Sequence, residues 1–156
     1  MNLSEFKLVV NELGLIESNK IREKFINEFV QINSKYYKEH IFKRIKCSDG
    51  MCYTGYIWGC IRGRKLIEYD MAITYIEQFN DVYVMWDINS KDRIFIPDYW
   101  KFEKESILKL NSKLLTNNLQ FFPEDIYIFN DTYEWTIALT HEDIDGKSFC
   151  LIATKF

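Results

Sequence analysis

The sequence has few of the residues that usually build metal centres and disulfide frameworks. Its 156 residues include two histidines, two prolines and four cysteines. The cysteines, at positions 47, 52, 60 and 150, form no CxxC pair and no zinc-ribbon pattern. We therefore expect reduced, mostly buried thiols and no resident metal or other cofactor. Cys60 has basic sequence neighbours, Arg62 and Arg64, of the kind that stabilise a thiolate.

Long apolar runs and linker-like tracts are also absent. No uninterrupted apolar stretch approaches the length of a membrane span. The first residues carry Glu5 and Glu12 and no basic leader, which does not fit a signal or transit peptide. No Pro-, Gly- or Ser-rich segment divides the chain. These absences predict a cytoplasmic protein, without membrane contact, that folds as a single domain over residues 1–156.

The short motifs of nucleotide binding and nucleophilic hydrolysis are missing as well. Glycines recur between residues 50 and 63, but neither a GxGxxG nor a GxxxxGK[ST] order is present. No GxSxG sequence places a serine at a nucleophile elbow. A phosphate-binding loop and a serine hydrolase are therefore not supported.

Negative charge is concentrated towards the C-terminus. The formal net charge is −3, and residues 119–156 hold seven acids against two lysines. An acidic surface repels phosphate backbones, so we expect no nucleic-acid partner. The same surface would attract a basic protein and accelerate its encounter.

Apolar periodicity predicts four helices. One spans residues 4–13, capped by Ser4 and ended by Gly14. A second starts at residue 18 or 19 and either continues to residue 45 or breaks near residues 33 and 34. A third spans residues 71–79 after Asp70, and a fourth, of about four turns, spans residues 103–117. A single helical turn is expected at residues 56–61, among the glycines.

The remaining apolar segments predict strands. Residues 82–88 are apolar on both faces and should form a central strand, and residues 94–97 a short one. Ile126–Phe129 and residues 134–140 flank an Asn-Asp turn, and the second run pairs with residues 148–154 through an Asp-Gly turn. In that run His141 should share a face with Trp135, Ile137 and Leu139.

The expected fold is α+β. N-terminal helices should pack on one face of a mostly antiparallel sheet of four or five strands. The predicted strand–helix–strand order over residues 82–129 indicates one βαβ-like crossover, and the last two strands form a C-terminal hairpin.

The strongest functional signal is a set of aromatic residues that alternate along the chain with aspartates and glutamates. Many of these aromatic side chains should pack in the core, but the alternation of a strand should leave others exposed on the surface next to the carboxylates. Such a surface has the composition of a binding hot spot for a basic protein, with carboxylates in the place of nucleic-acid phosphates. The predicted contact residues are Trp100, Glu124, Asp125, Asp131, Tyr133, Glu134 and Trp135.

An alternative site is a cleft that joins Asp87, the Tyr99–Trp100 segment, His141 and Glu142. Asp87 ends a hydrophobic strand, and His141 could act as a base oriented by an acid. A metal site at His141 with Asp143 and Asp145 lacks a second histidine nearby, because the other one is His40. We favour solvated acids at this hairpin over a metal site.

Three segments carry a resemblance. The runs VYVMWD (82–87), PEDIYIF (123–129) and EWTIALTHE (134–142) resemble segments of small uncharacterised proteins of low-GC bacteria, some of which are immunity-type proteins of polymorphic toxin systems. This resemblance implies inhibition of a toxin by direct binding, and it implies no particular fold or site residue.

The sequence therefore favours a non-enzymatic, immunity- or antitoxin-like protein that occludes a basic toxin domain, such as a nuclease. A small enzyme or ligand-binding domain with the Asp87–Trp100–His141 cleft is the second hypothesis. A structural subunit of a larger assembly, recognised by an apolar surface patch, is the third.

Overall fold

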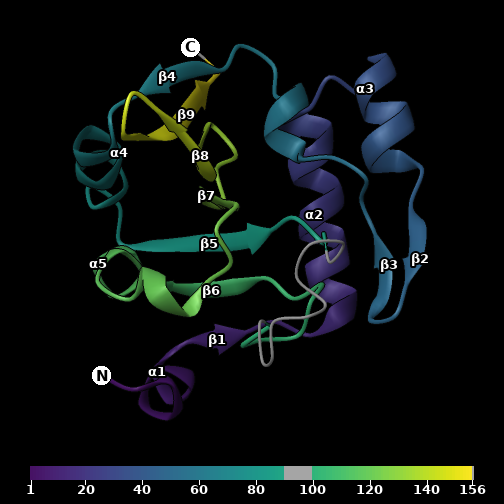
Figure 1. The fold of residues 1–156 in the computed structure, drawn as a ribbon. Helices are drawn as coiled ribbons and strands as arrows, with labels where there is room; N and C mark the ends of the chain where they lie inside the picture. Colours follow the sequence, from purple (N-terminus) through teal and green to yellow (C-terminus); the bar gives the residue numbers. More distant parts are fainter. Residues whose placement is uncertain (90–99, 156) are drawn as a thin grey trace.

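A single antiparallel sheet organises the chain (Figure 1). The computed structural model describes residues 1–89 and 100–155. The predicted strand at residues 94–97 and Tyr99 therefore lie outside the described residues. In spatial order the sheet contains β1 (Asn11–Glu12), β6 (Leu108–Asn111), β5 (Asp81–Trp86), β7 (Ile126–Phe129), β8 (Trp135–Ile144), β9 (Lys147–Thr154) and β4 (Lys65–Ile67).

The sheet has seven strands in the described part of the chain, and not four or five. Each neighbouring pair is antiparallel, so the βαβ-like crossover is wrong. The error lies in residues 103–117, which form β6 and the short helix α5 (Ser112–Thr116). Leu108 and Leu110 are buried while Lys109 is exposed, which is the period of two of a strand. Leu114 and Leu115 follow at a spacing that also fits a helix, so the sequence pattern is ambiguous.

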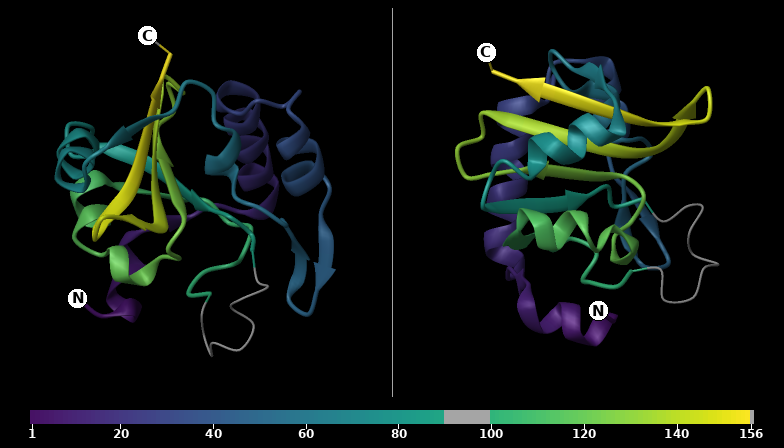
Figure 2. Two further views of the ribbon diagram at one scale, coloured as in Figure 1. Left: turned by 45° about the horizontal axis from the view of Figure 1, so that its top comes forward. Right: turned by 90° about the vertical axis from the view of Figure 1, so that its left-hand side faces the viewer.

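Helical layers cover both faces of the sheet, and not one face as expected (Figure 2). On one face lie α2 (Leu15–Phe29), α3 (Lys35–Tyr37), the π-helical turn η1 (Lys38–Phe42) and the 3-10 turn η2 (Ile57–Cys60). On the other lie α1 (Leu3–Val9), α4 (Tyr69–Ile76), α5 and the 3-10 turn η3 (Leu119–Phe121). Each face has its own core, because both sides of the central strands carry apolar side chains.

The N-terminal helices begin and end at other residues than predicted. Asn2 caps α1 in a capping box with Glu5, and the predicted cap Ser4 lies within the helix. Phe6 is the buried residue of α1, whereas Leu8 is exposed. Gly14 is the N-cap of α2 and does not end the preceding helix.

The later helices follow the expectations more closely. Helix α2 begins at Leu15, earlier than the predicted residue 18 or 19, and it buries Ile21, Phe25 and Phe29 along one side. The chain breaks after α2, and Ser34 caps α3, which decides between the two predicted lengths. The expected turn among the glycines is η2. Helix α4 begins two residues earlier than predicted and ends at Ile76, with Glu68 as its N-cap.

The strands of the C-terminal half match the sequence pattern well. β5 is central and β7 has the predicted bounds. β8 and β9 form the predicted hairpin, whose tip residues Asp145 and Gly146 have positive φ values of 51° and 77°. A second, separate hairpin of β2 (Ile45–Cys47) and β3 (Gly50–Cys52) lies beside α2 (Figure 1). No helix of the described residues is long and apolar enough to cross a membrane.

Candidate functional site

The predicted contact residues do not form one surface, because some of them are buried and the others lie apart. Asp125, Tyr133 and Trp135 are only 2%, 6% and 3% exposed, so their prediction as partner-binding residues is wrong. Trp135 stacks on Phe79 with ring centroids 4.5 Å apart. The ring of Tyr133 packs on Phe129 in the other core. The ring of Trp135 is buried because it lies in β8, an inner strand with a helical layer on each side, and Tyr133 lies in the turn just before that strand.

The other predicted contact residues lie apart from one another. Glu124 precedes β7, whereas Asp131 and Glu134 follow it at the opposite end, and all three are exposed. A four-residue strand separates these ends by about 13 Å. The half-buried Trp100 donates from its indole nitrogen to Asp49 at 3.0 Å, beside the β2–β3 hairpin. The four side chains therefore form no single patch.

Asp87 is buried in a hydrogen-bond network at the end of β5. Its carboxylate accepts the Tyr127 hydroxyl at 2.6 Å and the backbone N–H of Ile57 at 3.0 Å. The Tyr127 oxygen accepts the N–H of Trp58 at 2.8 Å. Burial raises the pKa of Asp87 to about 7, and burial beside Asp87 raises the pKa of Tyr127 well above its ordinary range. The network ties η2 to the sheet.

Asp125 forms the second half of this network, around His141. Its buried carboxylate accepts the Trp58 indole N–H at 3.1 Å, and it lies 2.9 Å from Nδ1 of His141. Nε2 of His141 lies 3.2 Å from Glu142. The His141 ring therefore lies between two carboxylates, the buried Asp125 and the exposed Glu142.

The position of His141 differs from the prediction. A register shift between Leu139 and Asp143 interrupts the alternation of β8. The His141 ring therefore packs against Tyr56 and Trp58, on the α2 side, with centroids 5.0 and 6.4 Å away. It does not share the face of Leu139.

The predicted cleft is thus assembled only in part. The N–H of Asp87 donates to the backbone oxygen of Asp125 at 3.4 Å, which places Asp87 next to the Asp125–His141 pair. Trp100 instead lies at the β2–β3 hairpin, over Lys104. Within residues 1–89 and 100–155, no group of three or more metal-ligating side chains converges.

Cys60 does not have the properties of a reactive thiol. It is buried in η2, and its Sγ lies 3.4 Å from the carbonyl oxygen of Ile57. Desolvation, followed by the nearby Asp87, raises the pKa of Cys60 to about 12. At neutral pH the side chain is a thiol, and the predicted influence of Arg64 is smaller than the effect of burial.

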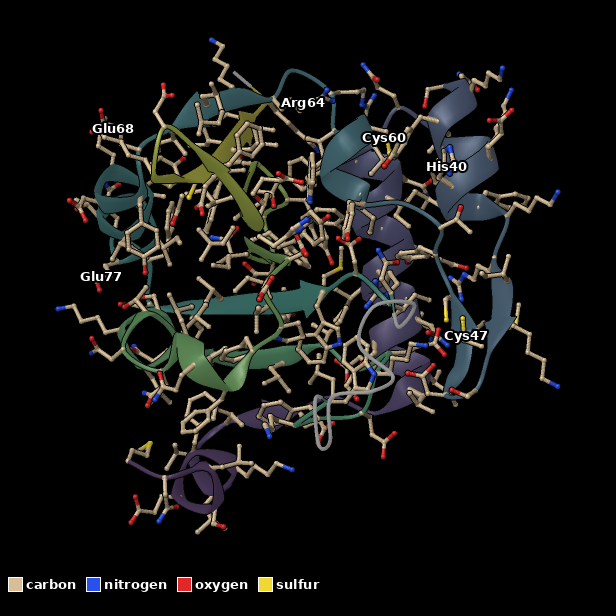
Figure 3. All side chains as sticks on the ribbon, in the orientation of Figure 1. His40, Cys47, Cys60, Arg64, Glu68 and Glu77 are labelled. Carbon is tan, nitrogen blue, oxygen red and sulfur yellow. The ribbon has the colours of Figure 1, made fainter. Side chains whose placement is uncertain are left out.

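An open groove lies at the edge of the sheet, and we call it the β9 groove. It has a volume of about 570 Å³ and lies between residues 66–70, where β4 turns into α4, and the β8–β9 hairpin at Ile144, Asp145 and residues 147–150. Leu66, Tyr69 and Ile144 are 64%, 41% and 47% exposed there. Figure 3 shows Glu68 at this junction, on the other side of the molecule from Cys47.

Carboxylates outnumber cations in the β9 groove. Glu68, Asp70 and Asp145 line it together with one cation, Lys147. Among the described residues, none of these three carboxylates lies within ion-pair distance of a basic group. Glu68 and Asp70 lie at the start of α4, where the helix dipole stabilises negative charge.

A second hollow continues the β9 groove towards His141. This His141 pocket has a volume of about 450 Å³ and shares Tyr69, Ser148 and Cys150 with the groove. It adds Glu124 and His141 to the lining. One continuous surface therefore carries four carboxylates, several exposed apolar side chains and the edge of the Asp125–His141 pair.

Most of this surface is not evident from the sequence. Glu124, His141 and Asp145 were predicted as candidate site residues, but no strand was predicted at residues 65–67 and no role for Leu66, Glu68 or Tyr69. The run KLIEYD contains the signal, since apolar side chains alternate with acids there. Only the tertiary pairing of β4 with β9 shows that this run meets the hairpin.

Comparisons with known proteins gave no relative. Neither the protein-family models, nor the curated proteins, nor the solved structures contain a match to this chain.

Proposed function

We propose that this protein is a non-enzymatic, immunity-like binding protein that occludes a basic protein partner, such as a toxin domain, in the β9 groove. The observation that carries the proposal is the combination of exposed apolar side chains with unpaired carboxylates in one groove. Leu66, Tyr69 and Ile144 supply the apolar part, and Glu68 and Asp145 the charge.

The apolar side chains would supply most of the binding free energy. Burial of a fully exposed leucine or isoleucine side chain is worth about 1.5–3 kcal/mol, and partly exposed ones gain proportionally less. A few such residues at the centre of an interface dominate its affinity. Leu66 and Ile144 are exposed at the rim of the groove, where the folded chain gains little from them.

The carboxylates would select the partner and accelerate the encounter. Four acids in the groove and the adjoining pocket face one lysine, Lys147. A basic partner is attracted to such a surface, and an acidic one is repelled. Attraction between exposed charges weakens as salt screens it.

Site-specific photo-crosslinking tests this proposal. A benzophenone side chain placed at Leu66 should crosslink a basic protein in the cytosol of the organism that carries the gene. The matched control places the benzophenone at Lys35, which is also exposed but lies on α3. If both positions crosslinked the same protein, or if Leu66 crosslinked an acidic protein, the β9 groove would not be the binding site of a basic partner.

Charge reversal provides the second arm of the test. Glu68→Lys with Asp145→Lys should abolish the crosslink from Leu66. Asp131→Lys with Glu134→Lys makes the same charge change at the other end of β7 and should leave it intact. If Asp131→Lys with Glu134→Lys also abolished the crosslink, the net charge of the protein and not the β9 groove would explain partner binding.

The Asp125–His141 pair supports a second candidate function, a small ligand-binding or enzymatic site in the His141 pocket. A buried carboxylate 2.9 Å from Nδ1 fixes the orientation of the His141 ring, which lies at the edge of the pocket, and an oriented imidazole is a common general base. A ligand would have to displace Glu142 from Nε2.

Imidazole ¹⁵N NMR with a metabolite extract tests this second function. A bound ligand should shift Nε2 of His141 and leave the ring of His40, which contacts Thr54, unchanged. Equal signals with and without the extract would remove the support for an enzymatic site.

A further inference from the structure

The β9 groove lies where the sheet leaves one strand partly uncovered. β4 pairs with β9 through three residues only, and its last pair joins Ile67 to Cys150. β9 itself begins at Lys147. Lys147 and Ser148 pair with Ile144 and Asp143 of β8, and Phe149 lies in the register shift of that pairing. In the described part of the chain, residues 147–149 have no β4 partner on their other side.

The chain turns away from the sheet at this point. Glu68 is already the N-cap of α4, and the helix starts at Tyr69. The turn leaves the space beside residues 147–149 open, and this space is the β9 groove. Backbone groups at an uncovered sheet edge are a template for an additional strand.

The lining of the groove selects the composition of such a strand. Leu66, Tyr69 and Ile144 offer apolar surface to the aliphatic stems of lysine or arginine side chains. The carboxylates of Glu68 and Asp145 lie in the same groove and can accept the charged ends. The aromatic face of Tyr69 adds a cation–π contact for a guanidinium group.

We propose that the partner enters the groove as an extended basic segment that adds a strand to the uncovered edge of β9 at residues 147–149. This inference rests on the proposed function and specifies how the partner is recognised. The added strand continues the line of β4 along β9. Main-chain hydrogen bonds fix its register, and the groove side chains select its basic and apolar residues.

Synthetic peptides test the mode of binding directly. The probe is a blocked hexapeptide that alternates valine and arginine, and its affinity for the full-length protein is measured by calorimetry. In an added strand, the N–H groups of every second residue point towards β9. N-methylation of one alternate set of amides should therefore weaken binding at least tenfold, whereas N-methylation of the other set should change it less than twofold.

Amide hydrogen exchange locates the bound peptide. Binding should slow exchange at one or more amides of residues 147–149 and leave the amides of β2 and β3 unchanged. A peptide that alternates valine and glutamate should not bind. The double change Glu68→Lys with Asp145→Lys should abolish binding of the arginine peptide.

Two outcomes would overturn strand addition. Equal loss of affinity with both N-methylated sets would indicate attraction by charge without backbone pairing. Protection of residues 45–47, which follow Arg44 and include Lys46, together with a dimer in sedimentation equilibrium, would show that a basic segment of a second copy of this chain occupies the groove.

The failure of strand addition is distinguishable from the failure of the proposed function. If the peptides do not bind but groove crosslinking from Leu66 still depends on Glu68 and Asp145, the partner uses the groove without adding a strand. If crosslinking from Leu66 is unchanged by Glu68→Lys with Asp145→Lys, the proposed function itself is wrong.

Discussion

Asp87 is the side chain through which pH should act most strongly on the stability of the fold. Burial raises its pKa from an ordinary value of 3.8 to about 7. Between these values the folded protein holds a proton that the unfolded chain has released. The free energy of unfolding therefore decreases as pH rises through this window, and the contribution of the protonated group is lost above about pH 7.

The size of the effect follows from the two pKa values. One pKa unit corresponds to about 1.36 kcal/mol, so the Asp87 contribution should decrease by about 3 kcal/mol between about pH 4.5 and 7.5. Asp87→Asn removes the titration and keeps the shape. Its amide oxygen can still accept the N–H of Ile57, while the rearranged contact with Tyr127 costs about 1 kcal/mol at low pH.

Urea denaturation followed by tryptophan fluorescence measures this difference. The variant should be less stable than the native protein at pH 4.5 and more stable at pH 7.5. The control Asp131→Asn changes an exposed acid and should keep the native pH dependence. Parallel pH profiles of the native protein and Asp87→Asn would refute the assignment of a raised pKa to Asp87.

Three further predictions concern single side chains. Gly59→Ala should lower the free energy of unfolding by about 1–3 kcal/mol, because an added Cβ would lie 2.8 Å from Cζ of Tyr36. Thermal melting measures the loss, and the control Gly14→Ala, which adds a Cβ in open space, should cost less. Trp135→Ala should cost about 3–5 kcal/mol in urea denaturation, since the ring is buried against Phe79, and a loss below 1 kcal/mol would contradict its place in the core. Leu66→Ala should cost less than about 0.5 kcal/mol of stability yet weaken partner binding at least tenfold in calorimetry, and an unchanged affinity would argue against Leu66 as an anchor.

Sequence patterns predicted the local elements better than their arrangement. β7, the β8–β9 hairpin and the buried stripe of α2 follow from periodicity and from the Asp-Gly turn, all of which act over a few residues. The helix predicted at residues 103–117 is wrong because the strand-like alternation of Leu108 and Leu110 is followed by Leu114 and Leu115, which together with them fit a helical period. Tertiary pairing with β5 decides for a strand there.

The site was harder to predict for the same reason. Asp87, Asp125 and His141 come from three segments, and only the sheet brings them together. Sequence patterns cannot distinguish the buried Asp125 from the exposed Glu124, because a shift of one residue in a strand exchanges its two faces. The β9 groove depends on Leu66 and Ile144, which are far apart in the chain and meet through the β4–β9 pairing.

The most direct test of the binding proposal is the affinity of the crosslinked partner, once purified, for two matched variants. Calorimetry at about 50 mM and about 300 mM salt spans the range over which screening weakens exposed charge pairs. Glu68→Lys with Asp145→Lys should weaken binding at least tenfold at low salt and reduce its salt dependence, whereas Asp131→Lys with Glu134→Lys should change affinity less than twofold. Equal effects of the two pairs, or no effect of either, would contradict the β9 groove as the partner site.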